Sequence, residues 1–237
     1  MIGLIQRVSE ANVTVAGNVI GEIGGFGSLY KLNGFKNPVL VSHTDSVGTK
    51  IRIGASLGRY ESLGLDIVHH CVNDILVAGA EPLCFMDYVA HADFSADQTA
   101  EAIRGVALAC QILNIPLVAG ETAQLPGVYR RGEFDLVGAV VGVADETNLL
   151  DINNVKPGDV VVALPSNGLH TNGFSLARRI FADIPLEKIL PELGRPLAEE
   201  LLAPHRCYLN DLRAFLPGIH SLAHITGGGL LDNIPRS

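Results

Sequence analysis

The chain has 237 residues, of which 17 are basic and 25 are acidic, giving a formal net charge of −8. Apolar residues make up 48% of it, which excludes a charge-expanded disordered chain and predicts one or two folded domains. The acidic balance disfavours nucleic-acid binding, since phosphate backbones repel it. We expect a cytoplasmic protein without membrane contact, because the sequence shows no signal-peptide pattern, no CxxC pair and no membrane-length apolar run.

Strand-like and helical segments alternate along the chain. Val- and Leu-rich runs bounded by Gly, Pro or Asp predict strands at residues 38–44, 83–90, 116–120, 134–144 and 159–165. Apolar residues at spacings of three and four predict helices at residues 60–78, 173–182 and 197–215. A further helix is expected after Ser95, where Gln98 completes a capping box. The alternation predicts an α/β fold with a mixed sheet.

A domain boundary is expected at residues 145–158, where Asp, Asn, Lys, Pro and Gly follow an apolar strand. The expected organisation has three parts. Residues 1–24 show a period-two pattern and form a β-hairpin-like extension, residues 25–147 form an α/β domain, and residues 148–237 form a second α/β domain with few strands.

The first candidate site follows the predicted strand at residues 38–44. Asp45 offers a hard oxygen ligand to magnesium, and Gly48 lets the backbone come close to a ligand. Lys50 offers a positive charge to a phosphate, although the glycine spacing is not that of a P-loop. An ordinary turn with a surface lysine would explain the same residues.

Two further segments supply carboxylates. Asn73 and Asp74 lie in an otherwise apolar helix, where they are costly unless paired or metal-bound, and Glu121 follows the predicted strand at residues 116–120. Carboxylates from separate segments suit a magnesium–nucleotide site, because magnesium takes few protein carboxylates together with phosphate oxygens. The alternative is that Asn73 and Asp74 satisfy neighbouring backbone groups.

A polar loop lies between the last predicted strand and the helix at residues 173–182. Its hydroxyl, amide and backbone N–H groups can bind a phosphate at a helix start, or can simply cap the helix. The role of His170 in this loop stays open. His69 and His70 lie on a mostly apolar helix and are expected to satisfy core hydrogen bonds rather than to act as acid or base.

From about Gly24 onward, these segments together resemble the phosphoribosylformylglycinamidine cyclo-ligase family. The matching strings are Gly24-Gly25-Phe26-Gly27, Thr44-Asp45-x-Val47-Gly48-Thr49-Lys50, Cys71-Val72-Asn73-Asp74 with Gly79-Ala80-x-Pro82, Gly120-Glu121-Thr122-Ala123, and His170-x-Asn172-Gly173-x-Ser175-Leu176. The resemblance implies a PurM-like, ATP-binding and dimer-forming domain over residues 25–147. It implies a truncated PurM-like domain over residues 148–237.

The resemblance also implies an activity, which is ATP-dependent cyclisation of formylglycinamidine ribonucleotide to aminoimidazole ribonucleotide, with ADP and phosphate released. The enzyme would be a cytoplasmic homodimer that uses ATP and Mg²⁺. Magnesium would be held by Asp45, Asp74 and Glu121, and the catalytic residues would be Asp45, Lys50 and Asp74. Further nucleotide contacts would come from Gly48, Thr49 and Asn73. The ribose phosphate would lie against Ser166, His170, Thr171, Asn172 and Gly173.

Some positions depart from the family pattern. His43 and Ser46 stand where small glycine-type residues are usual, and Ala92-Asp93 replaces a common Gly-Lys pair. Residues 1–24 resemble the opening hairpin of D-aminoacyl-tRNA deacylases, although the later catalytic segments of that family are not found. Three alternatives therefore stay open: a catalytically impaired nucleotide-binding remnant, another ATP-using enzyme of the superfamily, and a deacylase, which the net charge disfavours.

Overall fold

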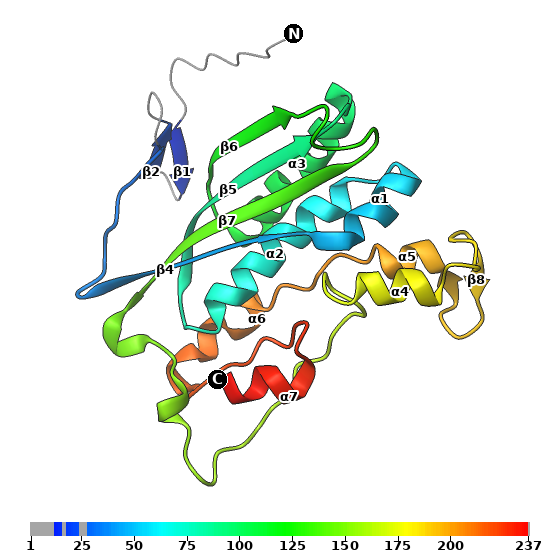
Figure 1. Ribbon diagram of the computed structural model, residues 1–237. Helices are drawn as coiled ribbons and strands as arrows, with labels where there is room; N and C mark the ends of the chain where they lie inside the picture. The colour runs from blue at the N-terminus through cyan, green and yellow to red at the C-terminus, as the bar shows by residue number, and fades with distance from the viewer. Residues whose placement is uncertain (1–11, 16–17, 24–27, 237) are drawn as a thin grey trace.

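The computed structural model describes residues 12–15, 18–23 and 28–236 and is built around a four-stranded mixed sheet (Figure 1). The sheet has the order β4-β7-β5-β6. Its strands are β4 (Pro38–Ser46), β5 (Glu81–His91), β6 (Leu117–Gln124) and β7 (Phe134–Asp145). β7 is antiparallel to β4 and β5, whereas β5 and β6 are parallel. The α/β fold and four of the five predicted strands are confirmed.

Two long helices cover one face of this sheet, and their residues form most of the core. They are α2 (Glu61–Leu76) and α3 (Ala96–Leu113), and a shorter α1 (Ile51–Leu57) precedes them. The predicted capping box is present, because Gln98 N–H donates to the Ser95 hydroxyl and Ser95 N–H donates to the Gln98 side chain. α3 is the crossover that parallel strands require between β5 and β6.

The contact between α2 and α3 depends on two glycines. A Cβ added at Gly64 would lie 2.5 Å from the backbone nitrogen of Val106, and one added at Gly105 would collide with the carbonyl oxygen of Glu61. The two helix backbones therefore approach more closely than any side chain allows. This contact holds α2 firmly beneath the sheet, which matters because α2 carries several residues of the candidate site.

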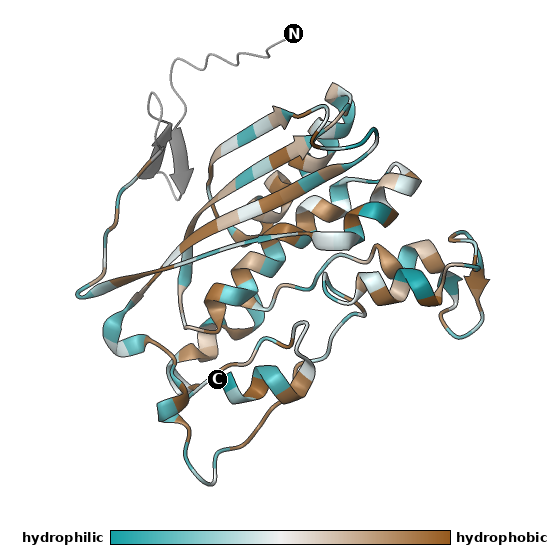
Figure 2. Cartoon of the chain, in the orientation of Figure 1, coloured by the Kyte–Doolittle hydropathy of each residue, from teal (hydrophilic) through white to brown (hydrophobic). Residues whose placement is uncertain are grey.

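Among the residues that the structure describes, no helix lies over the opposite face of the sheet (Figure 1). Along β7 the side chains alternate between buried residues toward the helices and half-buried residues on the outer face, such as Val137, Ala139 and Val141. Apolar residues run along β4 and β7 in Figure 2, and Leu40 on the outer face of β4 is 62% exposed. The outer face is thus both apolar and accessible.

The C-terminal third packs against α2 and the start of α1 as short elements joined by long coils. These are α4 (Phe174–Ile180), β8 (Ile189–Leu190), β9 (Arg195–Pro196), α5 (Leu197–Leu201), α6 (Leu209–Leu212) and α7 (Gly229–Asn233). Single 3₁₀ turns occur at Gly48–Lys50, Glu146–Asn148, Ile152–Asn154, Arg213–Gly218 and Ile234–Arg236. No helix in the described part of the chain is long and apolar enough to cross a bilayer.

Two sequence predictions in this third are wrong. Residues 159–165 form no strand, and Val161 is 91% exposed. The helix predicted at residues 197–215 is broken between α5 and α6 at Pro204, which has no N–H to donate. The neighbouring backbone groups bond to side chains of the first domain instead, as described below.

The N-terminal segment forms a separate three-stranded antiparallel sheet, β1-β2-β3. Its strands are β1 (Asn12–Val15), β2 (Asn18–Ile23) and β3 (Ser28–Tyr30). The hairpin expected within residues 1–24 is present at β1 and β2, and residues 1–11 lie outside the described part.

Substituting Gly105→Ala tests the close contact between α2 and α3. The added methyl group must push the two backbones apart, and we expect the free energy of unfolding to fall by about 2 kcal/mol. Urea unfolding followed by circular dichroism measures the change. Gly218→Ala is the control, because a Cβ there meets open space, and equal stability of the two variants would contradict the packing described here.

Candidate active site

The candidate site begins with four side chains that converge between β4 and α2. His43 and Asp45 lie two residues apart on β4 and so share the face toward the helices, while His70 and Asp74 lie one turn apart on α2. His70 Nε2 is 3.0 Å from Oδ2 of Asp45 and 3.0 Å from Oδ2 of Asp74. His43 Nε2 is 3.0 Å from the same Asp74 oxygen and 3.9 Å from Oδ2 of Asp45. We call these four residues the His/Asp cluster.

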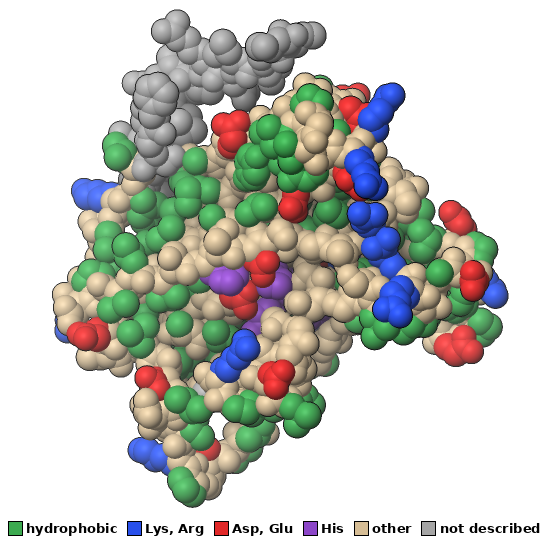
Figure 3. Space-filling model, viewed as in Figure 1, with side chains coloured by type: hydrophobic (Ala, Val, Ile, Leu, Met, Phe, Trp, Pro, Cys, Tyr) green, Lys and Arg blue, Asp and Glu red, His purple; other side chains and the backbone are tan. Residues whose placement is uncertain are grey.

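Figure 3 shows histidine and acidic side chains together at a hollow in the middle of one face of the molecule. Burial by itself would raise the pKa of Asp74, but the hydrogen bond with His224 and the nearby imidazoles of His43 and His70 hold that pKa well below its ordinary value. The carboxylate of Asp74 in turn raises the pKa of His43. The cluster therefore holds ionised carboxylate beside imidazole.

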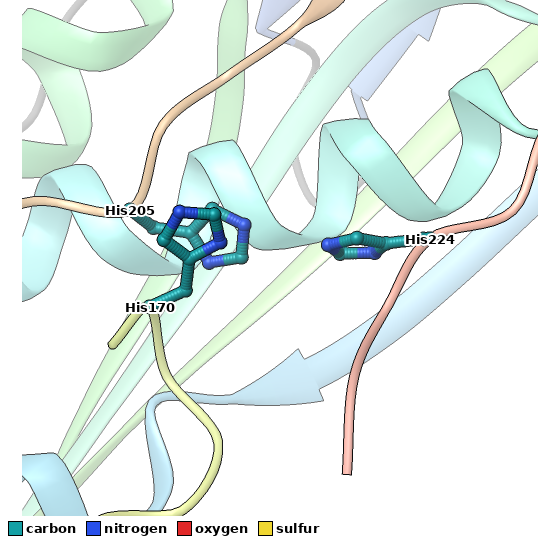
Figure 4. A group of neighbouring side chains, drawn as sticks. All are labelled: His170, His205 and His224. Carbon is teal, nitrogen blue, oxygen red and sulfur yellow. The ribbon is translucent and has the colours of Figure 1, made fainter. Parts of the chain in front are cut away.

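A second layer of residues comes from the C-terminal third. The ring of His70 contacts the buried hydroxyl of Thr171 through Nδ1, and His224 Nδ1 lies 2.8 Å from the other oxygen of Asp74. His170 and His205 stack at 4.1 Å between ring centres, beside His224 (Figure 4). Burial lowers the pKa of His170 to about 4 and lowers that of His205 further, so both rings are neutral at pH 7.

Lys50 is fully buried and does not face the hollow. Its ammonium group lies 2.8 Å from both oxygens of Asp66, which is also buried, and donates to the carbonyl oxygens of His170 and Ala203. These acceptors use all three N–H donors of the ammonium, so none remains for a phosphate. From the sequence we expected Lys50 to bind nucleotide and offset developing charge. In the structure Lys50 instead joins the start of α1 to the C-terminal third.

Asn73 is likewise occupied by the protein. Its side-chain amide donates to the backbone carbonyl of Arg206 and to His205 Nε2, and its carbonyl accepts the N–H of Tyr208. The alternative interpretation, in which these residues satisfy neighbouring backbone groups, therefore holds for Asn73. Asp74 instead faces the His/Asp cluster. Asp66 also accepts the N–H of His205.

Glu121 lies on the other face of the sheet. It pairs in register with Tyr88, which pairs with Val137 on the outer face, whereas Asp45 pairs with Gly138 on the face toward α2. Paired residues of neighbouring strands share a face. Within one chain, therefore, Asp45 and Asp74 come together and Glu121 does not join them.

The exposed turns that were predicted to bind phosphates lie close to one another. Gly48 has a positive φ of 68°, and the hydroxyl of its neighbour Thr49 is 3.1 Å from that of Ser175. The side chain of Asn172 lies against Gly227 in the turn at residues 226–229. Three turns from distant parts of the sequence thus meet beside the His/Asp cluster.

The predicted phosphate loop is only partly accessible. Ser166, Asn172 and Gly173 are exposed, and the Ser166 hydroxyl donates to the carbonyl of Gly168. Thr171 is 7% exposed and is engaged with the rings of His70 and His205. Thr171 therefore orients histidines in this structure rather than facing a ligand.

Sequence reasoning missed His43 and His70 as members of the site, along with His205 and His224. The sequence did contain a pattern that places His43 and His70 in the site, namely their spacing from Asp45 and Asp74. His43 is two residues before Asp45 on a strand, and His70 is four residues before Asp74 on a helix, so each pair shares a face. His205 and His224 lie in coils, where spacing carries no such information.

The residues expected to hold magnesium do not fit that ion. Magnesium requires oxygen ligands in octahedral geometry, yet two imidazole nitrogens lie among the carboxylate oxygens of Asp45 and Asp74. The third ligand expected for it, Glu121, lies on the other face of the sheet.

Comparisons with known proteins agree on one family. The model described as "AIR synthase related protein, N-terminal domain" matches residues 30–144, and the one described as "AIR synthase related protein, C-terminal domain" matches residues 156–237. Phosphoribosylformylglycinamidine cyclo-ligase of Thermoanaerobacter sp. (strain X514) is 43% identical over 240 residues, covering 100% of this chain and 71% of the relative. That of Anaeromyxobacter dehalogenans (strain 2CP-C) is 48% identical over 234 residues, covering 96% of this chain and 68% of the relative.

The fold also matches solved structures at low identity. Thiamine-monophosphate kinase from Stenotrophomonas maltophilia K279a is similar with a TM-score of 0.58 and 17% identity, over 93% of this chain and 63% of that one. At this identity the likeness concerns the fold alone, and it supports the PurM-like architecture.

The buried pair of Lys50 and Asp66 gives a stability prediction. Lys50→Met leaves the Asp66 carboxylate buried without its counter-charge, and we expect the free energy of unfolding to fall by about 3 kcal/mol or more. Urea unfolding measures this, with Lys188→Met at an exposed lysine as the control. An unchanged unfolding midpoint in Lys50→Met would contradict the structural role assigned here.

Proposed function

Because the chain belongs to the phosphoribosylformylglycinamidine cyclo-ligase family, we propose that it catalyses the ring closure of purine synthesis. In this reaction ATP activates the formyl-derived amide oxygen of formylglycinamidine ribonucleotide as a phosphate. An amidine nitrogen of the same substrate then attacks the activated carbon, and aminoimidazole ribonucleotide, ADP and phosphate are released. The reaction takes place in the cytoplasm.

The observation that carries this proposal is the meeting of three distant segments beside one hollow. The turn at Gly48 and Thr49 reaches the start of α4 through Ser175, and Asn172 reaches the glycine turn at residues 226–229. The first two segments belong to strings that resemble the family, and all three present exposed backbone or hydroxyl groups. Such groups bind phosphates without a P-loop.

Positioning accounts for most of what this site contributes. Holding the attacking nitrogen against the activated carbon of the same substrate favours the one conformer that can close the ring. Ser166, Asn172 and Gly173 hold the ribose phosphate, and the turn at Gly48 and Thr49 holds the phosphates of ATP. ATP enters as its magnesium complex, so that Mg²⁺ arrives as part of the substrate.

The His/Asp cluster lies at the floor of this site and shapes its charge. Its aspartate oxygens each lie 3.0 Å from an imidazole nitrogen of His43 or His70. The neutral ring of His170 accepts or donates hydrogen bonds without adding positive charge. Lys50 and Asn73 support the site by holding residues 203–208 across α2.

The protein acts as a homodimer formed through the outer face of the sheet. That face is apolar, it has no helix over it, and it carries Leu40 and Val141. Burying such a face is the ordinary way in which a half-covered sheet is stabilised. Glu121 then lies at the dimer interface.

Product formation tests the proposed activity directly. The purified full chain, supplied with MgATP and formylglycinamidine ribonucleotide, should form aminoimidazole ribonucleotide together with ADP. In Asn172→Ala we expect the KM for the ribonucleotide to rise about tenfold, because one hydrogen bond to a charged group is lost. Asn153→Ala, at an exposed turn away from the hollow, is the matched control.

Two outcomes would contradict this proposal. Turnover no faster than in buffer, with ATP binding retained, would identify a nucleotide-binding remnant. If Asn172→Ala has the same KM as Asn153→Ala, the ribose phosphate does not bind at the loop at residues 166–173.

The homodimer is tested by a charge placed on the outer face. Val141→Asp should convert the dimer into a monomer, because the interface would have to bury an unpaired carboxylate. Light scattering after gel filtration measures the mass. Ile112→Asp, on the exposed side of α3, should leave the dimer intact, and a monomeric parent chain would contradict the proposal.

A further inference from the structure

The four ligand-type atoms of the His/Asp cluster are arranged around one point. Nε2 of His43, Oδ2 of Asp45, Nε2 of His70 and Oδ2 of Asp74 lie within 4.8 Å of one another. The four separations given above are 3.0, 3.0, 3.0 and 3.9 Å. A tetrahedral zinc-type ion with bonds of about 2.0–2.1 Å places its ligand atoms roughly 3.3–3.4 Å apart, so these four atoms are already near that spacing.

In three of these side chains, the polar atom that faces away from the centre of the cluster is engaged by a neighbouring group, as is usual for metal ligands. His70 turns Nε2 toward the cluster because its Nδ1 contacts the Thr171 hydroxyl. Asp74 keeps Oδ2 free for the cluster because its Oδ1 is bonded by His224, and Asp45 uses Oδ1 to accept the N–H of Ser46. Such a second layer fixes the direction of ligand lone pairs and is a regular feature of metal sites.

One imidazole nitrogen in the cluster lacks a suitable partner. Nε2 of His43 is buried and, despite its 3.0 Å distance from Asp74, has no partner in hydrogen-bond geometry. A buried polar atom in that condition carries a desolvation cost. A cation between the histidine nitrogens and the aspartate oxygens removes that cost, because each atom then directs a lone pair at the ion.

We propose that His43, Asp45, His70 and Asp74 bind one divalent transition-metal ion of the zinc or cobalt class. Mixed imidazole and carboxylate ligands suit these ions, whereas magnesium prefers oxygen ligands alone. With four protein ligands the site is of the closed, structural type. The ion joins β4 to α2 at the floor of the hollow.

The metal site shares the floor of the hollow with the proposed cyclo-ligase site, but its binding of an ion is tested separately from that activity. His43 stands where the family usually has a small residue, so the fourth ligand belongs to this chain rather than to the general reaction. Metal binding is measured without ATP or ribonucleotide. Failure of either proposal would therefore leave the other standing.

Cobalt(II) is the probe for the test. The purified full chain, stripped with a chelator and dialysed, is titrated with cobalt chloride while visible absorption is recorded. We expect one equivalent to bind with the strong d–d bands of tetrahedral coordination. Zinc should displace the cobalt stoichiometrically, and millimolar magnesium should not.

Variants assign the ligands. His43→Ala and Asp45→Asn should each weaken cobalt binding by about tenfold or more, with circular dichroism showing that both are folded. His220→Ala is the matched control, because that exposed histidine pairs with Asp159 outside the cluster. The proposal is overturned if no tetrahedral bands appear, if magnesium displaces cobalt, or if both variants bind cobalt as His220→Ala does. Any of these results would mean that the histidines serve only as ion-pair partners of the aspartates.

Discussion

A lysine and an aspartate buried together hold the two halves of this molecule in place. Removing both charges from water is expensive, and the cost is offset only when every donor and acceptor finds a partner. The Lys50 ammonium finds its three acceptors in Asp66 and the backbone of His170 and Ala203, and Asp66 also accepts the N–H of His205. The segment at residues 203–208 is therefore bound across α2, and the C-terminal histidines reach the cluster as a consequence.

Local pattern predicted the elements whose stability is local or whose burial is regular. The strand β7 alternates cleanly, and the start of α3 is fixed by Ser95 and Gln98, so both could be predicted. The helix predicted at residues 197–215 failed because its periodicity spans a segment whose backbone serves Lys50, Asp66 and Asn73. These are tertiary hydrogen bonds, and the spacing of apolar residues along the sequence does not reveal them.

The site was predictable to the same limited degree. Asp45 and Asp74 could be grouped from sequence, and the matching spacing of His43 and His70 carried the rest of the cluster. Glu121 could not be placed, because the face that a strand residue occupies depends on its register with its neighbours. Lys50 was misjudged since a lysine after a strand is normally exposed, and only the buried carboxylate of Asp66 explains its position.

The valine-rich coil at residues 160–164 has a consequence for handling the protein. Val160, Val161 and Val162 are 85%, 91% and 75% exposed, and their backbone belongs to no ladder in the described part of the chain. β-branched residues with free N–H and C=O groups are a template for intermolecular strand pairing. We therefore expect aggregation of concentrated solutions to begin at this coil, and a lysine placed within it would act as a gatekeeper.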